Sequence, residues 1–191
     1  MDIITEHRVV VAAEPAPERF DWVSIRLHWL TVALVAFQLV TAFLPHDQGS
    51  GRLLLTLHRS AGTLTLGVVL FRLGWRAWFA DLPPLPRSMP SWQRGAARAN
   101  EYALYALLAL QPLTGLADGV FHGKPFMLFG LQVPALMAFD KPLFRLSGEL
   151  HEFGAKLLLA TIAIHIGAAL AHALVFRDGV MRRMLPARLS R

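Results

Sequence analysis

Three histidines, His151, His165 and His172, lie along the apolar segment LHEFGAKLLLATIAIHIGAALAH, which runs from residue 150 to residue 172. A helix turns about 100° per residue, so His151 and His165 lie within about 40° of each other, and His172 lies within about 20° of His165 on the same helix face. Ionisable side chains are rare inside membrane-spanning segments and are by default candidates for function. Imidazole nitrogens bind metals and carry protons, so this segment indicates metal-dependent, redox or proton-transfer chemistry.

The composition favours a membrane protein of one compact domain over a soluble protein. Of the 191 residues, 54% are hydrophobic and only 17% are charged. Cysteine is absent, which excludes disulfides, thiolate metal sites, iron–sulfur clusters and covalent haem attachment through C-x-x-C-H. The net charge of +6 comes with arginines at the ends of apolar runs. This distribution is typical of membrane topology and does not indicate nucleic-acid binding.

The sequence predicts an all-α membrane protein, a bundle of four transmembrane helices. The hydrocarbon core of a bilayer is about 30 Å thick and needs about 20 helical residues to cross it. Four apolar runs meet this length, at about 25–44, 53–75, 102–121 and 151–176. We expect residues 24–176 to form the transmembrane domain, with a connection at about 122–148 that lies against the bilayer surface or caps the bundle.

The distribution of positive charge predicts that both termini face the cytoplasm of a bacterial inner membrane. Residues 1–23 lack the apolar core of a signal peptide and are expected to form a flexible cytoplasmic extension, and residues 177–191 a basic cytoplasmic tail. In this topology thirteen of the nineteen Lys and Arg residues lie on the side of the termini. Cytoplasmic loops carry such an excess of positive charge.

The topology also pairs the histidines by depth. His58 and His151 lie near the periplasmic ends of their helices. His28 lies toward the cytoplasm, and its partner at that depth is His165 or His172, between which depth does not choose. Two neutral imidazoles that face each other across a helix bundle supply the two axial nitrogens of a bis-histidine haem. The alternatives are packing histidines, or an ion path in a transporter or metal carrier.

Several charged side chains lie at the same depths as the histidine pairs. Arg59 and Lys156 could neutralise haem propionates on the periplasmic side, and Arg26, Arg72 and Arg76 could do so on the other side. The same cations are equally suited to reach lipid headgroups at the membrane interface. Glu152 could orient the neighbouring His151 imidazole or face water.

Four segments of the sequence resemble the bacterial cytochrome b561 family. They are RLHWL, LHRSAGTLTLGVVLFRLGWR, YALYALLALQPLTGLA and LHEFGAKLLLATIAIHIGAALAHALVFRDGVMRRMLP, and the likeness runs from about Ser24 to Pro186. The resemblance implies a four-helix electron-transport protein with two b haems. By this likeness the axial ligands are two pairs, His28 with His165 and His58 with His151, so that His165 and not His172 binds iron.

The resemblance also implies partners for electron transfer. In related cytochromes a quinone site lies near the cytoplasmic-side haem, which here suggests a role for His172, Asn100 and Glu101. One activity in the family is the oxidation of periplasmic superoxide with ubiquinone as electron acceptor. The alternative is an anchor subunit that links a separate dehydrogenase or a soluble cytochrome to quinone.

Overall fold

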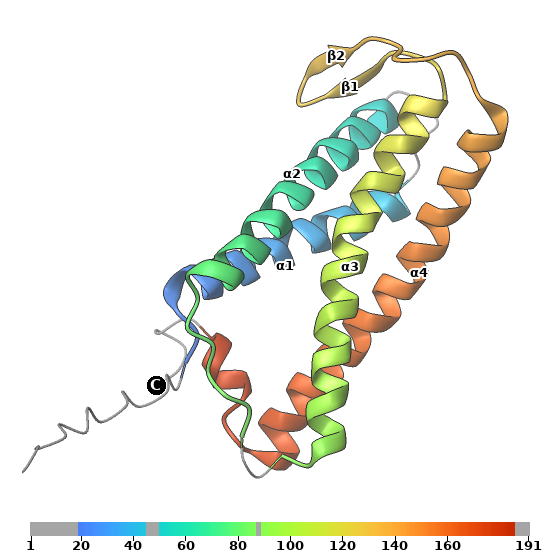
Figure 1. The fold of residues 1–191 in the computed structure, drawn as a ribbon. Coiled ribbons are helices and arrows are strands. Elements are labelled where there is room, and N and C mark those ends of the chain that lie inside the picture. The colour runs from blue at the N-terminus through green and yellow to red at the C-terminus, as the bar shows by residue number, and fades with distance from the viewer. Residues whose placement is uncertain (1–18, 45–49, 87–88, 186–191) are drawn as a thin grey trace, which may run out of the picture.

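Four long helices form most of the structure, a computed structural model that describes residues 19–44, 50–86 and 89–185 (Figure 1). The helices are α1 Trp22–Phe43, α2 Ser50–Trp78, α3 Ser91–Phe121 and α4 Lys141–Ala171. Each contains a stretch that is long and apolar enough to cross a membrane. The prediction of four helices of membrane-spanning length is therefore confirmed.

The helices extend beyond the apolar runs that predicted them. α3 begins at Ser91 and not near 102, and α4 begins at Lys141 and not near 151. Hydropathy marks only the part of a helix that crosses hydrocarbon, whereas the helix itself continues until a capping residue ends it. At the start of α4 the Asp140 side chain accepts a hydrogen bond from the Leu143 N–H, and Pro142 occupies the first turn, where its missing N–H costs nothing.

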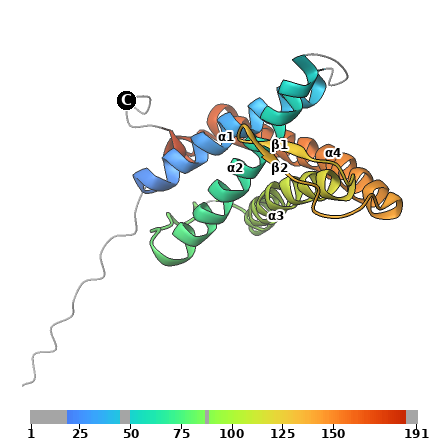
Figure 2. The ribbon, with the colours of Figure 1, turned by 90° about the horizontal axis from the view of Figure 1, so that it is seen from above.

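Helices that follow one another in the chain are also neighbours in space, α1 with α2, α2 with α3, and α3 with α4 (Figure 2). The buried apolar core is small and joins the last three helices through Val69, Leu108 and Leu158. Large apolar side chains are exposed on all four helices, including Phe37, Leu70, Leu110 and Ile164. Such extensive apolar exposure is unfavourable in water, so these faces are suited to contact with lipid.

A β-hairpin follows α3, which the sequence did not predict. β1 Phe126–Leu128 pairs antiparallel with β2 Leu131–Val133, and Phe129 and Gly130 between them both have positive φ, as a type I′ turn requires. The Phe129 N–H donates to Ser60 Oγ at 2.8 Å and so fastens the hairpin to α2. Strands of three residues are too short to show an alternating pattern. The predicted 122–148 connection is therefore this hairpin, a loop and the first two turns of α4.

Gly123 allows the chain to turn back from α3 toward α4. Its φ is +68°, and an added Cβ would collide with the backbone of Phe139. The Asp140 N–H donates to the Phe121 carbonyl at 3.1 Å, which closes this segment. The end of α3 and the start of α4 are thereby held together at what we call the hairpin end of the bundle.

The two described ends of the chain meet at the opposite end, which we call the termini end. The Phe20 N–H donates to the Arg183 carbonyl at 3.4 Å, Trp29 Nε1 donates to the Met184 carbonyl at 3.0 Å, and the Arg19 guanidinium donates to the Leu185 carbonyl. Part of the predicted tail is thus packed on the start of α1. Residues 1–18 of the predicted extension and residues 186–191 of the tail lie outside the described residues.

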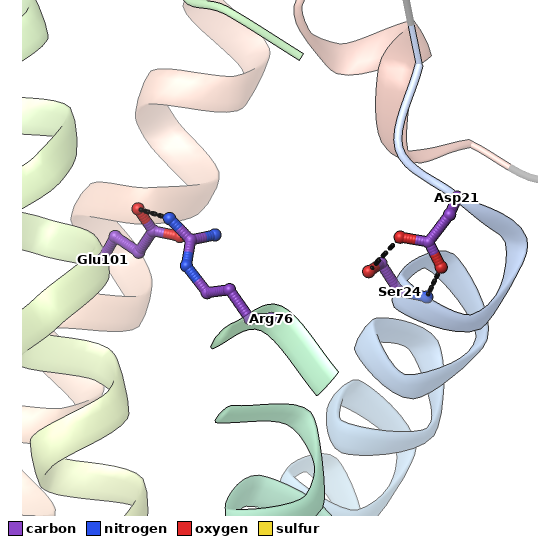
Figure 3. Close-up of polar contacts among 4 residues, drawn as sticks. All are labelled: Asp21, Ser24, Arg76 and Glu101. Atoms are coloured by element: carbon purple, nitrogen blue, oxygen red, sulfur yellow. Dashed lines mark hydrogen bonds and ion pairs between the residues drawn. The ribbon is translucent and has the colours of Figure 1, made fainter. Parts of the chain in front are cut away.

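Asp21 caps α1 and joins it to α2. Its carboxylate accepts hydrogen bonds from the Ser24 N–H at 2.9 Å and the Ser24 hydroxyl at 2.6 Å (Figure 3). It also accepts one from Trp75 Nε1 at 3.1 Å. Partial burial raises the pKa of Asp21, but hydrogen bonds from Ser24, Trp75 and Val23 outweigh it and lower the pKa below 3.8. The folded state therefore favours the ionised carboxylate.

Replacing Asp21 by Ala should lower the free energy of unfolding by about 1–2 kcal/mol, because a helix cap and a contact between helices are lost together. A folded-state pKa below the unfolded one means that this contribution is present above pH 3.8 and is lost as the pH falls through the lowered value. Thermal unfolding of the detergent-solubilised protein measures both effects. Asp81→Ala is the control, since Asp81 is exposed and forms no hydrogen bond with another described residue. Equal melting temperatures for the two variants would contradict the prediction.

Candidate functional site

The structure brings His58 of α2 and His151 of α4 together in the half of the bundle near the hairpin. Their ring centres are 6.3 Å apart and the ring planes are nearly perpendicular, at 81°. The two residues lie far apart in the chain, and only the packing of the bundle makes them neighbours. This is the pair that depth alone predicted for the periplasmic side.

A second pair lies nearer the termini end. His28 of α1 and His165 of α4 have ring centres 6.2 Å apart. His172 lies elsewhere, in a π-helical turn, His172–Phe176, that continues α4. Its Nδ1 is 2.6 Å from Asp178 Oδ2, and its ring contacts Phe176. Of the two partners for His28 that depth left open, the fold brings His165 to it.

Contacts from α3 hold the His151 ring. Nδ1 is 3.0 Å from the Gln111 carbonyl oxygen, which can only accept, so Nδ1 carries the proton and Nε2 keeps its lone pair. The Thr114 hydroxyl lies 3.1 Å from the same Nδ1, and Gln111 Nε2 donates to the His151 carbonyl at 3.1 Å. Gly115 and Gly154 make room for this arrangement, because an added Cβ would lie 3.0 Å from the His151 ring and 2.6 Å from Gln111 Oε1, respectively.

A threonine at the end of α1 holds the His58 ring. Thr41 Oγ1 is 2.9 Å from His58 Nδ1 and 3.0 Å from the carbonyls of Phe37 and Gln38. The hydroxyl donates to one of these carbonyls and can accept from Nδ1–H. The Gln38 amide nitrogen, in the orientation that satisfies its neighbours, lies 3.2 Å from both His58 Nδ1 and the His58 carbonyl. In that orientation the Gln38 amide donates to both atoms, and His58 Nδ1 is then an acceptor. If Nε2 of His58 bound a metal, Nδ1 would carry the proton, and the Thr41 hydroxyl would be within reach to accept it.

The rings of His28 and His165 have a different environment. Among the described residues no side chain or backbone group forms a hydrogen bond with either ring. Arg72 lies close enough for its positive charge to act on both rings, and its guanidinium stacks over the Tyr105 ring at 5.2 Å. A cation therefore accompanies this pair.

The other predicted propionate contacts are differently placed. Arg59 lies over the Phe126 ring at 5.3 Å and within electrostatic range of Asp118. Arg26 is exposed over the Trp22 ring. Lys156 is exposed and forms an ion pair with Glu152 at 2.7 Å. Glu152 therefore has a lysine partner, and the groups that orient His151 come from α3.

The three residues suggested for a quinone site do not form one cluster. Asn100 donates to the Thr161 carbonyl at 3.1 Å, and Glu101 forms an ion pair with Arg76 at 2.8 Å (Figure 3). α4 runs antiparallel to α3, and His172 lies three helical turns beyond Thr161, level with the beginning of α3. Glu101 instead lines a cavity of about 30 Å³ with Arg72, Arg76 and Tyr105, which has room for a water molecule and not for a quinone ring.

The two imidazole pairs fit a bis-histidine haem. Metal sites built from protein ligands alone need at least three, and no such group of His, Asp or Glu occurs among the described residues. A metal held by one of these imidazole pairs would therefore have to bring its other ligands with it, as haem iron does. An iron atom bound by two imidazole nitrogens at about 2 Å each, with ring centres about 1.2 Å beyond, would separate the centres by about 6.4 Å. The observed distances are 6.2 and 6.3 Å.

The chain matches the family described as prokaryotic cytochrome b561 over residues 19–187. The chain belongs to the prokaryotic cytochrome b561 family. It is 29% identical over 174 residues to cytochrome b561 homolog 1 of Escherichia coli K12, covering 89% of this chain and 98% of the relative. It is 32% identical over 174 residues to cytochrome b561 homolog 2 of the same organism, covering 88% and 92%. A protein named probable superoxide oxidase CybB from Yersinia pestis is 24% identical over 173 residues, covering 88% and 97%.

Cytochromes b561 are membrane electron-transfer proteins, and the family implies that this chain binds haem b. The many apolar side chains exposed on the four helices agree with a lipid environment.

Sequence reasoning missed the residues that hold the rings and one half-buried carboxylate, Asp118. Thr41 and Gln111 act through contacts between helices, for which a single sequence carries no signal. Asp118 did have a signal, since it is an acidic residue inside an apolar run. It lies within electrostatic range of Arg59, His151 and His122.

Replacing Gly115 by Ala should displace the His151 ring by a few tenths of an ångström, because the new Cβ would lie 3.0 Å from Cε1 and 3.3 Å from Nδ1. We expect a changed low-spin ferric EPR signal and a loss of about 1–3 kcal/mol of stability, as for other overpacked sites. Gly67→Ala is the matched control, since no atom lies within 4 Å of its added Cβ. An EPR spectrum identical to that of the Gly67→Ala protein would contradict the prediction.

Proposed function

We propose that this chain is a dihaem cytochrome b that carries electrons across a bacterial inner membrane and exchanges them with quinone. The observation that carries the proposal is the presence of two imidazole pairs, His58 with His151 and His28 with His165, each at the spacing of a bis-histidine haem. Haem b would supply one-electron chemistry at each pair. The protein's part is to hold the ligands, exclude water and adjust the potentials.

The two pairs are separated along the membrane normal. His151 and His165 are both on α4, and their 14-residue spacing corresponds to about 21 Å of helix axis. This length covers most of a hydrocarbon core about 30 Å thick. Each pair is therefore near one surface, as transfer of electrons across the membrane requires.

The positive-inside rule supports a cytoplasmic termini end and a periplasmic hairpin end. In this orientation the His58 and His151 pair would receive electrons from the periplasm. The relative named probable superoxide oxidase supports superoxide as the donor. Two superoxide ions would each lose one electron to become O₂, and one quinone would take up the two electrons and two protons to become quinol. Ubiquinone is the expected acceptor.

The pair formed by His172 and Asp178 suits proton delivery to a quinone at the termini end. Nδ1 of His172 is 2.6 Å from Asp178 Oδ2, and the second oxygen of Asp178 accepts from the Val180 N–H at 3.1 Å. A carboxylate that orients an imidazole leaves the far ring nitrogen available to a substrate oxygen. We assign the protonation of quinone to His172, and not to Asn100 or Glu101, whose side chains are engaged with Thr161 and Arg76.

A second candidate function rests on the apolar surface of the hairpin end. Phe129, Leu131, Leu136 and Phe139 are exposed there. This surface is suited to dock a periplasmic dehydrogenase or cytochrome, in which case the chain would be an anchor that passes the partner's electrons to quinone. The anchor should be inactive when purified alone.

Purified protein should contain two b-type haems per chain, measured as the pyridine haemochrome, with low-spin bands in the reduced-minus-oxidised spectrum. His58→Ala and His28→Ala should each retain one haem, and His122→Ala, whose ring packs on Phe139 and Phe144, should retain both. Absence of haem despite an adequate supply would reject the proposal. Rapid reduction of the two-haem protein by superoxide, followed by reoxidation by ubiquinone, would support the stand-alone enzyme over the anchor.

Replacing His172 by Ala should slow quinone reduction by about 10²-fold or more, which is the usual contribution of a general acid, while both haems remain bound. Stopped-flow reoxidation of the reduced haems by ubiquinone measures this rate. Asp178→Asn is the second variant and should slow the reaction less, since the imidazole remains. Unchanged kinetics with intact haem spectra would remove the role of His172.

A further inference from the structure

The two imidazole pairs differ in what their Nδ1 atoms contact. Both rings near the hairpin end have an acceptor, the Thr41 hydroxyl for His58 at 2.9 Å and the Gln111 carbonyl for His151 at 3.0 Å. Neither His28 nor His165 has a hydrogen-bond partner among the described residues. The two pairs therefore differ in the hydrogen-bonding environment of both of their imidazoles.

A hydrogen bond donated by Nδ1 changes the other nitrogen of the ring. It draws the imidazole toward imidazolate, which raises the basicity of Nε2 as a ligand. A more basic ligand stabilises ferric iron more than ferrous iron, so it lowers the reduction potential. Thr41 is only 2% exposed, so water competes poorly for its hydroxyl. The hairpin-end pair is thereby arranged for the lower potential.

Charge acts in the same direction at the other pair. Arg72 lies within electrostatic range of both His28 and His165. Glu101 acts on His165 in the opposite sense, but its effect there is smaller than that of Arg72, it does not act on His28, and it is paired with Arg76 at 2.8 Å. Arg72 is therefore the dominant charge at this pair. A nearby positive charge favours the reduced iron, which carries one charge fewer. The pair near the termini end is thereby arranged for the higher potential.

We propose that Thr41, the Gln111 carbonyl and Arg72 are positioning residues that give the two haems unequal potentials, lower at His58 and His151 and higher at His28 and His165. The inference rests on the proposed dihaem function and adds to it a direction of electron transfer. Electrons would move spontaneously from the hairpin end to the termini end. The gradient belongs to this chain's own residues and needs no partner subunit.

Potentiometric titration of the purified two-haem protein tests the inference. Thr41→Val should raise the lower of two reduction steps by the equivalent of about two- to tenfold in its oxidised-to-reduced ratio, tenfold being about 59 mV for one electron. Thr41→Ser keeps the hydroxyl and should restore the wild-type value. Thr65→Val is the matched control, because Thr65 is equally buried and its hydroxyl donates to the Ala61 carbonyl, away from any imidazole.

Arg72→Gln provides an independent test, which remains available if Thr41→Val does not fold. Arg72→Gln should lower the higher of the two reduction potentials and leave the lower potential unchanged. Arg72→Lys keeps the positive charge and should restore the higher potential to the wild-type value. The two substitutions together should narrow the gap between the steps from both sides.

The outcomes separate this inference from the proposed function. The pyridine haemochrome is measured first, and fewer than two haems per chain would defeat the proposed function and the gradient with it. Two haems that titrate at one potential in the wild type would overturn only the gradient. So would a Thr41→Val protein whose lower step and ferric EPR signal match those of Thr65→Val, or an Arg72→Gln protein whose higher step is unmoved.

Discussion

α4 contributes one imidazole to each pair, and the spacing between His151 and His165 determines where the other helices have to lie. α2 must bring His58 to one level of α4, and α1 must bring His28 to the other. α1 and α2 are antiparallel neighbours, so one hairpin of helices reaches both levels. α3 contributes no ring to either pair, and its part is to support α4 through Gln111 and Asn100. The packing of the four helices thus places two pairs of rings at two levels along α4.

The apolar surroundings make the polar groups of the bundle costly unless they are paired. The buried hydroxyls of Thr31, Thr41 and Thr65 donate hydrogen bonds to backbone carbonyls of the preceding turn, so they add no unsatisfied donor. Among the described residues, no buried side-chain nitrogen or oxygen lacks a partner. Thr41 Oγ1 also lies 2.9 Å from His58 Nδ1, so one buried hydroxyl contacts both the backbone of its own helix and the imidazole.

Hydrogen bonds within the protein also close the two ends of the bundle. The hairpin end is closed by backbone hydrogen bonds from Phe129 and Asp140, which leave the apolar side chains of the hairpin free to face lipid or a partner. The termini end is closed by hydrogen bonds from Trp75 Nε1 to Asp21, from Trp29 Nε1 to the Met184 carbonyl and from the Phe20 N–H to the Arg183 carbonyl.

Local chemistry along the chain determined the four apolar spans, the candidate histidines and the pairing of His58 with His151 by depth, because hydropathy and helical periodicity are properties of short segments. The same local signals underestimated the lengths of α3 and α4, whose polar first turns are helical because of caps and packing. They also could not detect strands of three residues. Depth left His165 and His172 as equal partners for His28; the family resemblance favoured His165, and the tertiary structure brings the His165 ring to that of His28. The partners of the imidazoles, Thr41 and the Gln111 carbonyl, were also decided by the tertiary structure. Each lies many residues from the ring it holds, and a hydrogen bond depends on the position of both atoms in space, which periodicity along one helix does not specify.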